Sequence, residues 1–407
     1  MSRLVTYASI GRLFTAGDDG TIEGAAMAVR DGVIVYAGPE TGLSPALGPN
    51  WQDGEVVDLG GALVTPGLVD AHSHPLYGGN RFPEIALRST GASYSEIAAG
   101  GGGIAATVAA TRATSTAELE ASVRERLRSW LAGGTTTIEA KTGYHLCASG
   151  ELDAVRILAG LADHDDVPSV EVTWLAAHGV GPEFGSDQDA YIEAACTWCD
   201  DARAAGARHA DVFCDEGYFT VGQSRRLLEA AAAAGLLPRI HADELARTGG
   251  AQLAAELSCA SADHLLLIDD SDAKAMAAAG VVATLAPVTA LAMGRTPPVQ
   301  ALLAAGVTIA LGSDHNPGTC GTTSMSLVIA LAVAELGLSV SEALTAATVG
   351  GAASLRLADR GRLEPGQRGD FVAWDADHEG AFAWSYGLDP LGVWKLGVPA
   401  GTASAEA

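Results

Sequence analysis

The sequence predicts an α/β protein in which a (β/α)8 barrel is joined to a small β-sandwich module built from both ends of the chain. Three observations predict this arrangement. Short β-rich apolar runs alternate with helix-length stretches from Pro66 onward, both chain ends are turn-rich and β-rich, and 407 residues suffice for one barrel with an appended module. A doubly wound open sheet is the alternative, because periodicity alone does not show that strands close into a ring.

The barrel is expected over residues 65–355. Its eight candidate strands end in the runs LVDAHSH, TTIEAKTGY, VEVTWLAAHG, ADVFCDEGY, PRIHADE, SADHLLLI, VVATLAP and VTIALGSDHNPG. Between them lie segments such as ELEASVRERLRSWLAGG and SRRLLEAAAAAGLL, whose leucines recur at helical spacing. Strands that alternate with helices in this way favour a parallel sheet.

The small module is expected from residues 1–64 and 356–407. Residues 26–38, AMAVRDGVIVYAG, contain two β-rich runs around an Asp-Gly turn, which indicates a hairpin. We interpret residues 361–375, GRLEPGQRGDFVAWD, as a second strand pair. Neither end has enough strands to be stable alone, so we expect both to share one module.

Composition excludes several functions. A net charge of −25 argues against nucleic acid as a partner, because no basic surface is available to displace counterions from phosphate. The longest apolar run, LVIALAVA from Leu327, is too short to cross a membrane. The first residues lack the pattern of a secretion signal, and six cysteines are too few for a disulfide scaffold. We therefore expect a cytoplasmic protein.

Residues with metal-binding chemistry recur where the candidate strands end. Because a barrel presents its functional groups at the carboxyl ends of its strands, these side chains should meet at one mouth. Strand alternation should turn the first two histidines to the same side. Any one histidine is more often a packed side chain than a ligand, but joint placement at strand ends is hard to explain in that way. The residues are His72, His74, His178, His241, His264 and Asp314.

Three imidazoles and one carboxylate in this group form a set that suits one Zn²⁺ or Fe²⁺ ion. A metal there would lower the pKa of a bound water from about 16 to about 7. The predicted ligands are His72, His74, His241 and Asp314.

Lys141 bears on the number of metals. A carbamylated lysine can bridge two metals, but this lysine ends the second candidate strand, and the fourth ends in Cys214, Asp215 and Glu216. One metal is therefore favoured over two. Lys141 itself either acts in the site or forms an ion pair at the barrel mouth, for example with Glu139.

Two further motifs have weaker chemical content. Cys196 and Cys199 form a lone C-x-x-C in a predicted helix, and helix packing is favoured because no second ligand pair is nearby. The glycines of residues 100–103 lack the spacing of a phosphate-binding loop. We interpret them as a mobile loop that closes over the site, with a plain linker as the alternative.

Taken together, these motifs resemble the amidohydrolase superfamily and, more narrowly, the imidazolonepropionase family. The resemblance covers nearly the whole chain, and its GGNR, KTGY and DHNPG segments are more specific than the H-x-H pair. One departure is the loop at residues 286–298, where relatives usually carry an aromatic residue and which bears on substrate shape. The matching segments are PGLVDAHSHPLYGGNR, GASYSEIAAGGGGIAATVAATR, GTTTIEAKTGY, DVFCDEGYF, HADELARTGGAQLAAEL, SADHL, SDHNPGT and GRLEPGQRGDFVAWD.

The resemblance implies hydrolysis of 4-imidazolone-5-propanoate to N-formimidoyl-L-glutamate, a step of histidine degradation. An activated water would attack the ring carbonyl, and the amide C–N bond would open. It also implies one Zn²⁺ or Fe²⁺/Fe³⁺ ion per subunit, and we expect a homodimer. The implied substrate contacts are Arg81, Tyr144, His178, Glu244, Asn316, Gly318 and Thr319, and the implied catalytic residues are Glu244, His264 and Asp314.

These residue types fit that chemistry. Arg81 offers a fork of donors to the propanoate carboxylate, with a surface ion pair as the alternative. Glu244 is placed to move a proton between the water and the leaving nitrogen, unless it is only a helix-start carboxylate. His264, with Asp314, is placed to hydrogen-bond the oxygen that becomes negative.

Two other functions compete with this one. A deaminase of a purine or pyrimidine base in the same superfamily would use a similar His-x-x-Glu, but a neutral base needs no arginine clamp such as Arg81. A non-catalytic barrel scaffold is less favoured, because the complete ligand set would serve no purpose without a metal.

Overall fold

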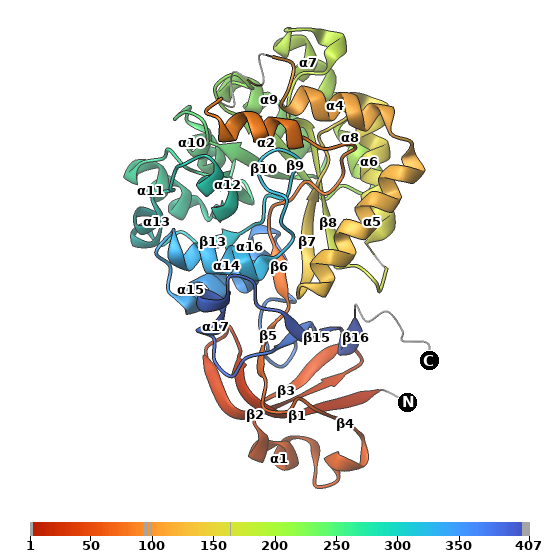
Figure 1. Ribbon diagram of the computed structural model, residues 1–407, viewed down its shortest axis with the longest axis vertical. Coiled ribbons are helices and arrows are strands. Elements are labelled where there is room, and N and C mark those ends of the chain that lie inside the picture. Colours follow the sequence, from red (N-terminus) through yellow and green to blue (C-terminus); the bar gives the residue numbers. More distant parts are fainter. Residues whose placement is uncertain (1–2, 93–96, 98–99, 163, 401–407) are drawn as a thin grey trace.

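The computed structural model describes residues 3–92, 97, 100–162 and 164–400, and Figure 1 shows a barrel stacked on a smaller sheet. The predicted α/β architecture, a (β/α)8 barrel with a β module from both chain ends, is confirmed.

All eight predicted barrel strands are present, and each pairs in parallel with the next along the chain. This sequential order differs from a doubly wound sheet, in which the order reverses. At the mouth the ring is closed by hydrogen bonds from the Ala71 N–H to the Leu311 carbonyl (3.1 Å) and from the Asp314 N–H to the His72 carbonyl (2.8 Å). The strands are β6 (Leu68–Asp70), β7 (Thr135–Lys141), β8 (Ser169–Ala177), β9 (His209–Cys214), β10 (Leu237–Ala242), β11 (Ser261–His264), β12 (Val282–Leu285) and β13 (Ile309–Leu311).

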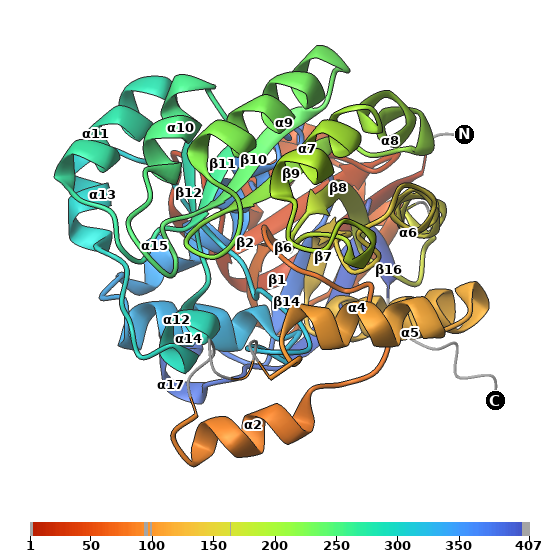
Figure 2. The same cartoon turned by 90° about the horizontal axis from the view of Figure 1, so that it is seen from above.

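Helices surround these strands, as Figure 2 shows from above, while α2 lies outside the ring. The predicted helical segments correspond to α5 and α9, which start where Ser115 and Thr220 cap the first turn. Within the described residues, every helix is too short or too polar to cross a lipid bilayer. The helices are α2 (Phe82–Ser89), α4 (Ile104–Ala113), α5 (Thr116–Ala132), α6 (Ala148–Leu161), η3 (Pro182–Phe184), α7 (Gln188–Cys196), α8 (Cys199–Ala205), α9 (Val221–Ala233), α10 (Gly250–Glu256), α11 (Asp270–Ala279), α12 (Pro287–Ala292), α13 (Val299–Ala305), α14 (Met325–Ala334), α15 (Val340–Thr345), η4 (Ala346–Gly350), α16 (Gly351–Ser354) and α17 (Ala381–Ser385).

The small module is one mixed sheet in the order β16-β15-β14-β5-β1-β2-β3, with β4 paired to β1. The predicted hairpin is β2–β3, and Asp31 and Gly32 at its turn both have positive φ (50° and 84°), as a type I′ turn requires. Its elements are β1 (Leu4–Phe14), β2 (Thr21–Arg30), β3 (Val33–Pro39), η1 (Glu40–Gly42), α1 (Leu43–Leu47), η2 (Trp51–Asp53), β4 (Glu55–Asp58), β5 (Leu63–Pro66), β14 (Phe371–Trp374), β15 (Pro390–Lys395) and β16 (Val398–Ala400).

The prediction of a strand pair within residues 361–375 was wrong. Only β14 is a strand there, and it pairs with β5 and β15 instead. The preceding residues turn at Pro365 and Gly366, where proline lacks an N–H and glycine takes a φ of 95°. Neighbouring residues are held by backbone hydrogen bonds, such as that from the Leu363 N–H to the Thr15 carbonyl just after β1 and that from the Gly366 N–H to the Ile34 carbonyl of β3.

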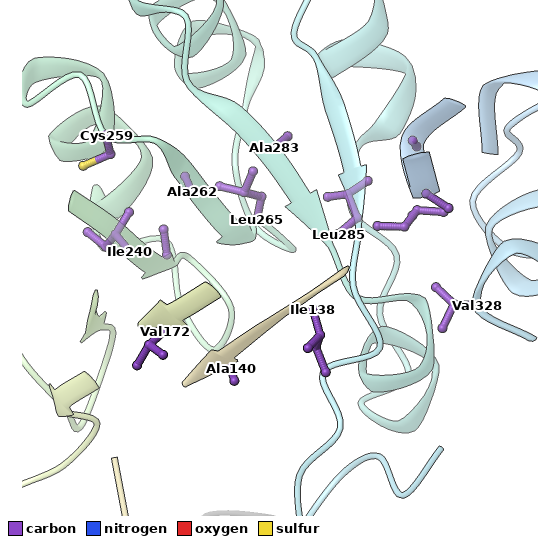
Figure 3. Packing of buried hydrophobic residues seen from close by; sticks show 14 of the residues in the cluster. Ile138, Ala140, Val172, Ile240, Cys259, Ala262, Leu265, Ala283, Leu285 and Val328 are labelled. Atoms are coloured by element: carbon purple, nitrogen blue, oxygen red, sulfur yellow. The ribbon is translucent and has the colours of Figure 1, made fainter. Parts of the chain in front are cut away.

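One hydrophobic core joins the barrel and the small sheet. Figure 3 shows part of it, with Ile138 and Val172 from barrel strands and Val328 from α14. Trp374 of β14 belongs to the same core, and its indole Nε1–H donates to the Thr65 hydroxyl at 2.8 Å. A Cβ on Gly134 would lie only 2.8 Å from the Trp374 ring, so glycine is what lets the barrel approach the sheet so closely. This shared packing fixes the base of the barrel and leaves its other end for function.

Candidate metal centre and active site

His72 and His74 follow strand β6 and turn to the same side at the barrel mouth. Their Nε2 atoms lie 3.3 Å apart, and both side chains are buried. Ser73 between them points away, and its hydroxyl donates to the Glu139 carbonyl at 2.6 Å. The alternation expected from the sequence is therefore what the structure contains.

Asp314 and His241 complete a group around these two histidines. The Asp314 Oδ1 atom lies 3.5 Å from His72 Nε2 and 3.4 Å from His74 Nε2. The His241 ring centroid lies 4.6 Å from that of His72. Two triads of ligand atoms each lie within 4.8 Å of one another, His72–His74–Asp314 and His72–His241–His264. The structure thus brings together all four predicted ligands, with His264 beside them.

The surroundings of these imidazoles fit a divalent metal ion. Burial lowers the pKa of His74 to about 4, so its ring is neutral and can act as a ligand. His72 Nδ1 lies 2.7 Å from Asp263 Oδ2, and His241 Nδ1 lies 3.0 Å from Asp211 Oδ2. A carboxylate at Nδ1 fixes the tautomer of a histidine that binds metal through Nε2.

The backbone is strained where three of the strands end. Asp243, His264 and Asp314 have φ values of 53°, 72° and 49°, a region that residues other than glycine seldom adopt. This backbone conformation costs about 1–3 kcal/mol of conformational free energy per residue. It persists at functional sites, where surrounding contacts hold it in place. Asp243 is held by hydrogen bonds that its carboxylate accepts from the N–H groups of Thr248 and Gly249.

A cavity opens at this mouth, and nearly all the predicted site residues line it. Only His72 and Gly318 of that set do not. Gly318 lies directly behind the lining, since a Cβ on it would be 2.3 Å from Arg81 Nη1. The sequence reasoning missed four apolar lining residues, which no chemical motif identifies: Ile104, Phe213, Leu245 and Met293.

Arg81 is a buried side chain paired with Glu84. Its Nη2 and Nε lie 2.7 and 2.8 Å from Glu84 Oε2, and the guanidinium faces the cavity. A surface ion pair is thereby excluded. Glu84 Oε1 also accepts from the Gly103 N–H at 3.0 Å, so the glycine-rich segment lies against the same pair. Closure of that segment over the site stays a prediction.

Glu244 is buried in the cavity wall. Burial, together with Asp314 and Asp215 nearby, raises its pKa to about 8. The Asp215 carboxylate accepts hydrogen bonds from the N–H groups of Glu244 (2.7 Å) and Leu245 (2.8 Å) and so holds this loop. A helix-start role for Glu244 does not apply, because α10 begins only at Gly250.

Asn316 shapes the loop after β13. Its Oδ1 accepts from the N–H groups of Gly318 (2.8 Å) and Thr319 (2.9 Å), and its Nδ2 donates to the Asp314 carbonyl at 2.7 Å. This arrangement presents Thr319 to the cavity beside Asp314.

Tyr144 and His178 form an aromatic wall of the cavity. The His178 ring stacks on that of His74, with centroids 5.0 Å apart and planes at 18°. The Tyr144 ring centroid lies 5.1 Å from that of His178. This aromatic wall therefore begins at the ring of His74, one of the predicted metal ligands.

The segment of residues 286–298, predicted to be a loop, contains helix α12 and contacts the centre directly. Thr289 donates a hydrogen bond to Asp314 Oδ2 at 2.6 Å, and Met293 lines the cavity. Arg295 donates to the Glu244 carbonyl at 2.9 Å. Thr289 is a residue that the sequence reasoning missed, because its contact with Asp314 arises only from folding.

Lys141 forms the expected ion pair with Glu139 at 2.7 Å, and both side chains are fully buried within the barrel.

Cys196 ends α7 and Cys199 begins α8, so the prediction that both lie within one helix was wrong. Residues 197–198 form a turn that separates the two helices. Neither cysteine belongs to a metal-type cluster in the described part of the chain.

A closed eight-stranded parallel barrel with buried imidazoles and a carboxylate at its mouth defines the class of barrel enzymes that use a divalent metal. The model of the Amidohydrolase family matches residues 80–381. The imidazolonepropionase of Anaeromyxobacter dehalogenans is 42% identical over 371 residues, which cover 90% of this chain and 88% of the relative. That of Sphingopyxis alaskensis is 43% identical over 380 residues, covering 92% and 93%. The chain therefore belongs to the amidohydrolase family and, within it, to the imidazolonepropionases.

Solved structures with the same fold are more distant. An adenosine deaminase from Xanthomonas campestris with bound zinc has a TM-score of 0.69 and 20% identity, covering 97% of this chain and 92% of that chain. An atrazine chlorohydrolase from Arthrobacter aurescens complexed with zinc has a TM-score of 0.71 and 18% identity, covering 97% and 94%. At such identity the likeness shows the fold alone.

Proposed function

We propose that this chain hydrolyses the ring amide C–N bond of 4-imidazolone-5-propanoate to give N-formimidoyl-L-glutamate in histidine degradation. Membership of the imidazolonepropionases supports this function. The observation that carries it furthest is that one cavity is lined both by the buried Arg81 and by the histidine–aspartate centre. A substrate with a carboxylate on one side and a hydrolysable ring on the other fits such a cavity.

The centre would hold one Zn²⁺ or iron ion per subunit through His72, His74, His241 and Asp314. The two triads of ligand atoms share His72, which favours a single ion. When bound, the metal would supply a water that is activated at neutral pH.

Glu244 would carry the proton of the reaction. A pKa of about 8 lets this carboxyl exchange a proton near neutral pH, from the attacking water to the leaving ring nitrogen. His264 Nδ1 lies 3.8 Å from Glu244 Oε1, within the same cavity. Because burial keeps the pKa of His264 well below its ordinary value, a neutral His264 would hydrogen-bond the developing negative oxygen. Asp314 would assist as a ligand next to both groups.

Arg81 would bind the propanoate carboxylate. The guanidinium can form two parallel hydrogen bonds to a carboxylate, which a point charge cannot. Tyr144, His178, Asn316, Gly318 and Thr319 would complete the pocket around the ring and the side chain.

Two assays test this function. One follows the loss of the ultraviolet absorbance of 4-imidazolone-5-propanoate, and the other measures ammonia release from guanine and cytosine. We expect hydrolysis of the imidazolone and no ammonia from either base. Ammonia from a base, with the imidazolone untouched, would favour the deaminase. A metal-free protein that is inactive on all three compounds would favour the scaffold. The homodimer and the cytoplasmic location stay predictions.

A further inference from the structure

Five charged side chains form a cluster inside the barrel, next to the proposed metal centre. They come from strands β7, β9, β10 and β11, and all are fully buried. None of them lines the cavity described above. This charge cluster consists of Glu139, Lys141, Asp211, Arg239 and Asp263.

Lys141 lies among the three carboxylates of the charge cluster. Its Nζ atom donates to Asp211 Oδ2 at 2.6 Å, to Glu139 Oε1 at 2.7 Å and to Asp263 Oδ2 at 3.3 Å. An ammonium has three hydrogens to donate, so this geometry uses all of them.

Two of these oxygens also contact the proposed ligands. Asp211 Oδ2 lies 3.0 Å from His241 Nδ1, and Asp263 Oδ2 lies 2.7 Å from His72 Nδ1. One ammonium thus spans two separate carboxylate–histidine pairs through the very oxygen atoms that face the imidazoles.

Arg239 ties the charge cluster to the backbone. Its Nη2 donates to the Ala71 carbonyl at 2.8 Å, immediately before His72, and lies 3.4 Å from Asp263 Oδ2. Its Nη1 donates to the Ser354 carbonyl at 2.8 Å. The arginine therefore secures one side of the cluster, while Lys141 is the group that reaches both aspartates.

We propose that Lys141 is a positioning residue that holds Asp211 and Asp263 so that His241 and His72 present Nε2 to one metal ion. This inference rests on the proposed metal centre. It assigns Lys141 neither a bridging nor a carbamylated form, because all three of its hydrogens are engaged by carboxylates. Mutation of a group that hydrogen-bonds a metal ligand typically lowers metal affinity by about 10–100-fold. Lys141 contacts two such groups, Asp211 and Asp263.

Titration of the metal-free full-length chain with Zn²⁺ against a chelating dye at neutral pH tests the proposal. The variants are Lys141→Met, which removes the charge, and Lys141→Arg, which keeps it. Lys274→Met is the matched control, because Lys274 is exposed on α11. Circular dichroism establishes that each variant is folded before the titration.

We expect Lys141→Met to bind Zn²⁺ about 10–100-fold more weakly than the unaltered chain, and Lys141→Arg to bind more tightly than Lys141→Met. Lys274→Met should match the unaltered chain. A folded Lys141→Met with unaltered zinc affinity would overturn the proposal, and so would failure of both Lys141 variants to fold, since the lysine would then serve the fold alone. An unaltered chain that binds zinc but leaves the imidazolone intact would overturn the proposed function without touching this inference.

Discussion

Arg81 and Glu244 line the same cavity but have different surroundings. Arg81 Nη2 lies 2.7 Å from Glu84 Oε2, whereas burial of Glu244 raises the pKa of its carboxyl to about 8. The sequence could identify both residues, through the GGNR segment and the His-x-x-Glu spacing. It could not identify Glu84 and Asp215 as their partners, because those contacts depend on how the loops fold.

Replacing Glu244 with glutamine should slow the chemical step. The amide keeps the shape of the side chain but cannot carry a proton, so we expect kcat to fall by about 10²–10⁴-fold. Steady-state kinetics and metal analysis measure this, with Glu216→Gln as an exposed control. A kcat within a few-fold of the unaltered chain would remove the proton-transfer role.

Replacing Arg81 with alanine should weaken substrate binding. Loss of a charge-assisted pair worth about 3 kcal/mol should raise KM by about 10²-fold. The same kinetic assay checks it, and Arg30→Ala on β2 serves as an exposed control. An unchanged KM would show that the propanoate binds elsewhere.

At the scale of elements, the strands could be predicted more completely than the turns that follow them. Apolar periodicity indicated all eight barrel strands, because each is buried in the ring. The positive φ values of Asp243, His264 and Asp314 were not predicted, since nothing in these residue types requires them. They arise from tertiary contacts, as does the bond from Thr289 to Asp314.

The loop after β10 gives a test at this scale. The Asp215 carboxylate holds this loop by accepting hydrogen bonds from the N–H groups of Glu244, Leu245 and Ala246. Asp215→Ala should displace Glu244 and lower kcat by about 10-fold or more, as expected for a small displacement of a reacting group. Kinetics beside Glu216→Ala measure the effect, and equal kcat values in the two variants would contradict it.

At the scale of the whole molecule, the prediction that both chain ends form one module was correct. The prediction of which strands pair with each other at the C-terminal end was wrong. The strand β14 pairs with β5 from the other end of the chain, and local sequence carries no signal for such a distant partner. The same long-range packing places Trp374 between the sheet and the barrel.

Trp374→Ala should therefore destabilise the molecule without altering the site. Truncation of a fully buried tryptophan costs about 3–5 kcal/mol in free energy of unfolding. Urea denaturation measures the loss, with Trp384→Ala as the control because that side chain is 85% exposed. Equal stability of the two variants would contradict a core shared by barrel and sheet.

The central claim is that three imidazoles and one carboxylate gather around one catalytic metal ion. Anomalous X-ray diffraction from crystals of the active protein, at the zinc and iron absorption edges, measures this most directly. We expect one peak per subunit within about 2.0–2.2 Å of a nitrogen or oxygen atom of each of His72, His74, His241 and Asp314. Active crystals with no peak among these four side chains would contradict the account.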